Sequence, residues 1–315
     1  MIRTLPVLVV IALIAALPVF GDNYLLRLGT MFAMYAVLAY SWNVIGGFAG
    51  YPSFATAAFF GLGAYAGALM QGAGVPMPFA WASAGIVSAV FALLLGFAIL
   101  HLKGHYFAIA SLVIAQVLME IATSWSSFTG GGTGLNLPVL RISIEAQARL
   151  FFWSMLALAV MAFLMNVAVA RTRFGFALTC IRQNEDASAM VGINPTLYKV
   201  AAFVCSAVFV GAAGAMYASW VFYIEPGDVF RVLVSVKPIV MVMLGGAGTV
   251  LGPGIGALLF LVLEEVVWRS FLSVHAMVLG VIIVALIFFL PRGVLGLVRR
   301  RKAAKVPAFS PGRSA

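Results

Sequence analysis

The residues of this sequence whose types and spacing could support chemistry gather in a polar island, residues 171–195, between two long apolar stretches. Asn184 can cap a helix there, and Glu185 and Asp186 place negative charge on its first turn, where the helix dipole favours it. Gly192 supplies a left-handed stop. The pattern predicts one short capped helix of about two turns.

Such a helix is suited to docking on another protein. So short a helix is marginal alone in water, because its first turn is costly to form, and something must therefore pack on it. Ala187, Met190 and Val191 fall at i, i+3 and i+4 and form a narrow apolar face of the kind that binds a groove on another protein. Asn194 and Pro195 then open the next apolar stretch as a cap followed by proline. The alternative is a plain connection between two membrane helices, the commoner case for such a loop.

Catalytic, metal and cofactor chemistry has little support in the sequence. Cys180 and Cys205 are the only cysteines and indicate neither a disulfide framework nor a metal site. His101, His105 and His275 are scattered, without a second ligand at metal spacing. No Gly-x-x-x-x-Gly-Lys-Ser/Thr motif occurs, so we expect no ATP binding through a phosphate loop. We expect no cofactor and no enzymatic activity, and any energy for active work must come from another chain.

The composition requires a membrane protein, because 64% of the residues are hydrophobic, 9% are charged and the mean hydropathy is +1.12. Long unbroken apolar runs exclude a transmembrane β-barrel, whose strands alternate polar and apolar side chains. The fold class expected is therefore an all-α integral membrane protein with about ten (eight to ten) transmembrane helices. They are expected near residues 5–21, 24–45, 53–71, 77–101, 105–127, 149–170, 196–223, 235–247, 251–268 and 273–291.

The net charge of +10 does not indicate nucleic-acid binding, because much of it lies in a basic tail directly after the last span. With the N-terminus in the cytoplasm, only six of the 19 Lys and Arg residues fall outside, which agrees with the positive-inside rule. Both termini are thus predicted to be cytoplasmic. Residues 1–298 form one transmembrane domain, and residues 299–315 are expected to be a disordered cytoplasmic tail.

Two glycine-rich breaks, residues 46–53 and 245–254, interrupt apolar segments in opposite halves of the chain. Paired breaks of this kind point to a substrate route in transporters, because interrupted helices expose backbone groups that can solvate a polar solute. Glycine also lets helices pack closely in lipid, so a tight helix crossing is an equal alternative. The candidate translocation path consists of the glycines and nearby polar residues: Asn43, Gly46, Gly47, Gly50, Ser53, Thr56, Gln116, Gly245, Gly246 and Gly248.

Acidic residues within the apolar stretches are few. Glu120, Glu264 and Glu265 lie near the ends of predicted spans, where their carboxylates are expected to reach the lipid headgroups. A proton- or sodium-coupled carrier, a proton-pumping subunit or a membrane protease would be expected to carry more such groups.

Several short segments follow one another in a characteristic order and spacing: WNVIGGFAG at 42–50, AAFFGLGAY at 57–65, YFA at 106–108, TGG at 129–131 with Leu135, RFG at 173–175 with Ala177 and Leu178, GGAG at 245–248 and PRGVLG at 291–296. Through the order and spacing of these segments, the chain resembles, over nearly its whole length, the permease subunits of ABC importers for branched-chain amino acids.

The resemblance implies that the polar island is the loop that couples the permease to its ATPases, similar to the Glu-Ala-Ala...Gly pattern of importer permeases. Here Asp186-Ala187-Ser188 stands six residues before Gly192, and Glu185 stands one residue earlier, so either acid can take the part of the pattern's glutamate. The coupling residues expected are Asn184, Glu185, Asp186, Ala187, Ser188, Met190, Val191 and Gly192.

The resemblance also implies a heteromeric assembly in a bacterial plasma (inner) membrane. Its other parts would be a second related permease, two ATP-binding cassette subunits and an extracytoplasmic solute-binding protein. The expected solute is a leucine-type amino acid or an allied small solute such as an amide or urea. The alternative function is a self-sufficient secondary carrier or channel for a small neutral solute.

Overall fold

In a computed structural model the chain is described at residues 22–270, 277, 280–281 and 293–295, and most of these residues are helical. The long helices are α3 (Asn23–Trp42), α4 (Thr56–Gly72), α5 (Met77–Ile99), α6 (His105–Ser124), α8 (Ile144–Arg171), α11 (Pro195–Val221), α13 (Val232–Gly245) and α14 (Gly252–Ser270). The shorter ones are α7 (Ser126–Thr129), α9 (Arg173–Gln183), α10 (Glu185–Met190), α12 (Pro226–Val229), the π-helix Asn43–Phe48 and the 3-10 helix Gly131–Thr133.

These helices confirm the all-α membrane class. Among the described residues, α3 with its π-helix, α5, α6, α8 and α11 are long and apolar enough to cross a membrane. A helix also lies at each of the three other predicted spans, although α4 and α13 are shorter and α14 carries three charged residues. The predicted spans 5–21 and 273–291 and the predicted tail 299–315 lie outside the described residues.

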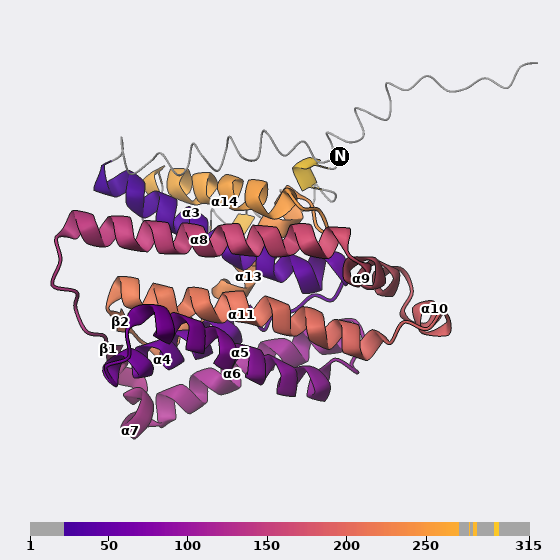
Figure 1. The fold of residues 1–315 in the computed structure, drawn as a ribbon, viewed down its shortest axis with the longest axis horizontal. Helices are drawn as coiled ribbons and strands as arrows, with labels where there is room; N and C mark the ends of the chain where they lie inside the picture. Colours follow the sequence, from indigo (N-terminus) through magenta and orange to yellow (C-terminus); the bar gives the residue numbers. More distant parts are fainter. Residues whose placement is uncertain (1–21, 271–276, 278–279, 282–292, 296–315) are drawn as a thin grey trace, which may run out of the picture.

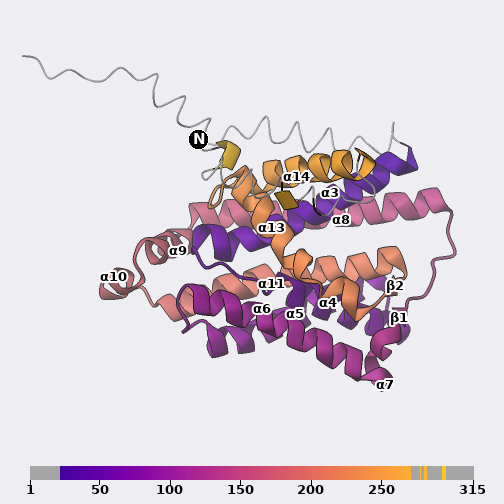
Figure 2. The ribbon, with the colours of Figure 1, turned by 180° about the vertical axis from the view of Figure 1, so that it is seen from behind.

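Figures 1 and 2 show the long helices in two layers, with α3, α8 and α14 in one layer and α4, α5, α6 and α11 in the other. Helices α9 and α10 lie at one end of the molecule, called here the α10 end. Helix α7 lies at the opposite end, the α7 end, together with β1 (Leu135–Asn136) and β2 (Tyr223–Ile224). The two strands pair antiparallel, with Leu135 opposite Ile224, and so fasten the loop after α7 to the end of α11.

Small residues bring α11 into close contact with α4 and α5. A Cβ atom on Gly63 would lie 2.1 Å from the Gly211 carbonyl oxygen, and one on Gly214 would lie 2.1 Å from that of Phe60. Because lipid tails are as apolar as the helix side chains, the hydrophobic effect does not drive helices together within a membrane. Close van der Waals packing of this kind holds them together instead. Phe59 and Phe203 fill the same interface edge to face, with ring centroids 4.9 Å apart.

The acid Glu264 does not reach outward as the sequence suggested. Its carboxylate accepts hydrogen bonds from Lys237 Nζ at 2.8 Å and from the Tyr35 hydroxyl at 2.8 Å. The three residues come from α14, α13 and α3, and each side chain of the ion pair is about three-quarters buried. A charge within the helices is thus neutralised by a partner that lies 27 residues away in the sequence.

The α4–α11 crossing predicts a strong difference between two glycines of α4. Gly63→Ala is expected to lower the free energy of unfolding by about 1–3 kcal/mol, the usual cost of overpacking, although alanine is the better helix former. Gly72→Ala is the matched control, because nothing lies within 4 Å of its Cβ position. Unfolding of the purified protein in detergent measures both; equal stability of the two variants would contradict the crossing.

Candidate functional site

The polar island folds into two helices, where the sequence predicted one. Helix α9 was not predicted, because polar and basic residues interrupt its apolar pattern. Its apolar residues Ala177, Leu178 and Ile181 are buried against the membrane helices. Thr172 separates α9 from α8, and Asn184 separates α9 from α10.

The predicted capping of α10 is confirmed. The Asn184 side chain accepts a hydrogen bond from the Ala187 backbone N–H at 3.0 Å, and Gly192 has a φ of +86°, which ends the helix. The Asn194 side chain accepts from the Leu197 N–H at 3.3 Å, with Pro195 at the first position of α11. Both ends of α10 are therefore defined by local sequence.

The apolar face of α10 points away from the described chain. Met190 is 88% exposed and Val191 is 76% exposed, and Ala187 beside them is also exposed. Ser188 faces the other way; it is buried, and its hydroxyl donates to the Glu185 carbonyl at 2.7 Å. The helix thus presents methionine and valine outward at the α10 end, where no described residue covers them.

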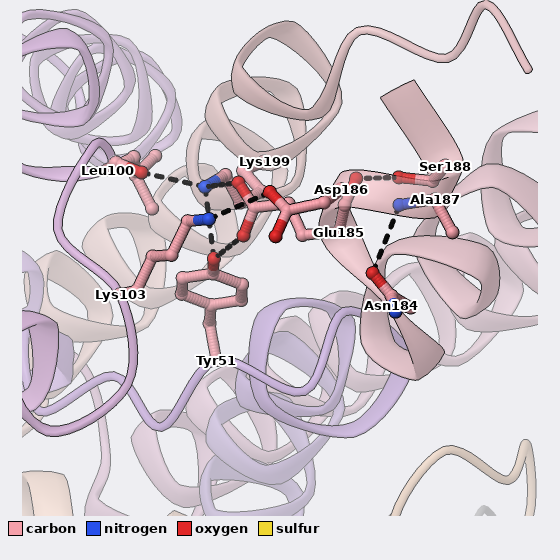
Figure 3. A network of polar contacts seen from close by, with 9 residues as sticks. All are labelled: Tyr51, Leu100, Lys103, Asn184, Glu185, Asp186, Ala187, Ser188 and Lys199. Atoms are coloured by element: carbon pink, nitrogen blue, oxygen red, sulfur yellow. Dashed lines mark hydrogen bonds and ion pairs between the residues drawn. The ribbon is translucent and has the colours of Figure 1, made fainter. Parts of the chain in front are cut away.

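The opposite face of α10 is fastened to the membrane helices by a buried cation (Figure 3). Lys199, on α11, is 1% exposed and donates to Glu185 Oε1 at 2.7 Å, to the Leu100 carbonyl at 2.8 Å and to the Tyr51 hydroxyl at 3.1 Å. The Tyr51 hydroxyl in turn donates to the second Glu185 oxygen. All three ammonium protons therefore have partners, and these come from three separate segments.

The two adjacent acids have different surroundings. Asp186 pairs with Lys103 at 2.9 Å, but both side chains are largely exposed, so this pair contributes little. Burial alone would raise the pKa of Glu185, but hydrogen bonds from Lys199 and Tyr51 and the charge of Lys199 outweigh it and hold that pKa below its usual value. Burial and the neighbouring Glu185 raise the pKa of Tyr51, which keeps its hydroxyl protonated as a donor.

The two glycine breaks meet in the structure, next to α9. The Asn43 side-chain oxygen accepts from the Gly248 N–H at 2.9 Å, and its amide donates to the Thr249 carbonyl at 3.1 Å. A Cβ on Gly47 would lie 2.6 Å from the Gly248 nitrogen, so only glycine permits this approach. From α9, Arg182 donates to the Gly47 carbonyl at 2.8 Å. The breaks are therefore in direct contact with the polar island.

The structure gathers most but not all of the candidate path residues. Asn43, Ser53 and Thr56 are buried and lie at the first break, whereas Gln116 is exposed on α6, where its amide donates to the Met119 sulfur at 3.9 Å. The other glycines are packed closely: a Cβ would lie 2.3 Å from Trp42 at Gly46, 2.5 Å from Arg182 at Gly50 and 1.8 Å from the Gly252 carbonyl oxygen at Gly245. Gly246 has a φ of +125° and donates to the Val242 carbonyl at 2.8 Å.

Sequence reasoning missed three polar residues of this site. Lys199 and Asn166 are single polar residues within apolar stretches, and Arg182 was placed in the polar island without a contact to the glycine breaks. Asn166 is fully buried on α8, accepts from Asn43 at 2.9 Å and donates to the Tyr40 carbonyl at 2.8 Å. An isolated lysine or asparagine in a membrane helix was the available signal, because such a residue is retained only with a partner.

The buried cation predicts that the two acids of α10 differ in importance. Glu185→Gln is expected to lower the free energy of unfolding by about 1–3 kcal/mol, because Lys199 loses its countercharge. Asp186→Asn, the matched control, is expected to change it by less than about 0.5 kcal/mol. Denaturant unfolding in detergent measures both variants.

The stabilisation that Glu185 contributes depends on pH in a defined way. Because the folded-state pKa of Glu185 is lowered, its stabilisation is present above the ordinary carboxyl pKa and is lost as the pH falls through the folded-state value. The stability difference between wild type and Glu185→Gln should therefore close in acid. A difference that stays constant down to pH values below the ordinary carboxyl range would contradict this assignment.

Comparisons with known proteins identify the family of the chain. The sequence model of the family described as branched-chain amino acid transport system / permease component matches residues 24–290. The chain is 28% identical to the high-affinity branched-chain amino acid transport system permease protein LivM of Salmonella typhimurium, over 86% of this chain and 70% of that protein. It is 26% identical to the protein of the same name from Escherichia coli, over 92% and 74% of the two chains.

An archaeal relative is the probable branched-chain amino acid transport permease protein LivM of Methanocaldococcus jannaschii, 23% identical over 84% of this chain and 91% of that protein. No solved structure matches the chain. Because the family match extends over most of the sequence, the chain belongs to the family of permease components of branched-chain amino acid transport systems.

Proposed function

We propose that this permease is one of two related membrane subunits of an ABC importer, and that separate ATPase subunits drive it through α9 and α10. The observation that carries the proposal is the orientation of α10. Its apolar residues Met190 and Val191 are exposed, while Glu185 on its other face is fastened to the membrane helices. A helix held in this way can transmit force from a groove that grips it.

The proposed solute is a branched-chain amino acid or an allied small solute, delivered by an extracytoplasmic binding protein. The names of the relatives support the amino acid, and the lack of a phosphate-loop motif in the sequence supports separate ATPase subunits. Substrate choice would then be shared between the binding protein and the permease.

Closure of the ATPase pair would move α10 together with α9, and this would displace two sets of contacts between the polar island and the rest of the chain. Glu185 connects α10 to Lys199 on α11 and to Tyr51, which precedes α4. Arg182 connects α9 to the Gly47 carbonyl in the first glycine break, the candidate route for the solute. Displacement of the polar island would thus reach the membrane helices and the glycine breaks together.

The α10 end would face the cytoplasm of a bacterial cell, with both termini on that side. The basic residues support this orientation, as the positive-inside rule requires of cytoplasmic loops. Arg171 ends α8, Arg173 and Arg182 belong to α9, and Lys103 pairs with Asp186 of α10.

The proposal predicts that Met190→Asp disrupts the contact with the ATPases. In the reconstituted importer, ATP-dependent leucine uptake is expected to fall at least about tenfold, because a charge would enter an apolar contact. The matched control is Val139→Asp, 71% exposed but in the loop between β1 and α8 at the α7 end, where the contact with the ATPases should be retained. Gly192→Leu should act like Met190→Asp, because leucine is strained at a φ of +86°. Normal uptake by a correctly assembled Met190→Asp complex would refute the coupling role.

The ATPase requirement is tested separately with the permease alone. Purified and placed in liposomes without ATPase subunits, the chain is expected to accumulate no solute. Accumulation or rapid downhill flux of leucine under these conditions would instead identify a self-sufficient carrier or channel.

A further inference from the structure

A cavity of about 450 Å³ lies between α4, α5 and α6 at the α7 end, opposite to α10. Leu62 and Ala66 of α4 and Leu118 of α6 contribute aliphatic walls. Trp125 and Phe128 stand at its mouth, each 53% exposed, with ring centroids 5.2 Å apart. The cavity is only partly open, and its size is in the range of small-molecule sites.

The lining is almost entirely apolar, and no charged residue belongs to it. The Thr129 hydroxyl is occupied by the backbone, 2.6 Å from the Ala122 carbonyl oxygen and 2.7 Å from that of Trp125. A solute held here must therefore place an uncharged, apolar part in the cavity, because a buried charge without a partner is costly.

The wall also contains the ring of Tyr65, which is 5% exposed and stacks on that of Phe230 with centroids 5.9 Å apart at 16°. Its hydroxyl is inaccessible and has no hydrogen-bond partner among the described residues, so Tyr65 offers the cavity an aromatic surface and no polar contact.

We propose that this cavity is a subsite for the aliphatic side chain of the transported amino acid, with the ring of Tyr65 in its wall. The inference rests on the proposed function and names where in this chain the substrate class is read. The isobutyl or isopropyl group of leucine, isoleucine or valine packs between the aliphatic and aromatic walls. The ammonium and carboxylate groups stay towards the mouth, beside the half-exposed Trp125.

The position of the cavity suits this role. It is bounded by α7 and adjoins the glycine-rich loop in which Gly130, Gly131 and Gly134 all have positive φ. In the proposed orientation this end faces the binding protein that releases the solute. Helix α4 forms one wall, and its other end begins directly after the loop that holds Tyr51, the partner of Glu185.

Filling the cavity tests the subsite in the complete importer with its binding protein. Ala66→Leu is expected to reduce kcat/KM for leucine uptake at least about tenfold, because a few methylene groups in an apolar pocket decide discrimination of this size. Ala82→Leu is the matched control, an exposed alanine of α5 outside the cavity, and should leave uptake unchanged. ATPase activity and subunit assembly are followed in both variants to verify folding.

A local readout decides which molecule occupies the cavity. In an importer whose Cys180 and Cys205 are replaced by serine, maleimide labelling of Ala66→Cys should be slowed by leucine but not by glycine. Protection by phospholipid alone, or unchanged leucine kinetics in a well-assembled Ala66→Leu complex, would overturn the subsite. If the wild-type complex imports no branched-chain amino acid at all, the proposed function fails instead, whatever the cavity variants do.

Discussion

A lysine ammonium buried among apolar helices must be paired, and that requirement fixes the position of α10. The cation of Lys199 meets a carboxylate, a carbonyl and a hydroxyl, all within 3.1 Å. Such a network adds little net stability, because the desolvation of the charges offsets their attraction, but losing one partner is costly. Its main effect is therefore positional: α10, α11, the end of α5 and the segment before α4 can meet in only one arrangement.

A second buried polar set holds the other side of the polar island by a different means. Here the groups are neutral amides and carbonyls, joined by the Arg182 guanidinium, and glycine permits the backbones to touch. Asn43 reaches the second break and Asn166, and Arg182 adds the contact from α9. In a low-dielectric interior these satisfied hydrogen bonds are directional and specify one packing. The two alternatives for the glycine breaks are thus not exclusive, because a tight crossing can also lie beside a route for the solute.

Local features of the sequence were predictable, and distant partners were not. The cap at Asn184, the stop at Gly192 and the proline start of α11 follow from neighbouring residues, and long apolar runs gave most helices. Helix α9 has a mixed composition, and the β1–β2 pair joins residues 89 and 87 positions apart through two residues per strand, so neither has a periodic signal. The pairing of Lys199 with Glu185, Tyr51 and Leu100 depends on how four segments pack. The cavity is likewise a property of three helices together.

Helix α4 connects the two ends of the molecule. It begins at Thr56, five residues after Tyr51, and Tyr65 stands on its third turn in the wall of the cavity. At 1.5 Å per residue, about 14 Å of helix separates Thr56 from Tyr65. Between these two residues Gly63 packs directly on Gly211, so α4 cannot shift freely against α11, the helix that carries Lys199. Packed helices move as rigid bodies rather than deform. In the proposed importer, a shift of α10 therefore changes the cavity through α4 and α11. By linkage, a solute in the cavity favours one position of α10 over another only to the extent that it binds more tightly to the protein in that position.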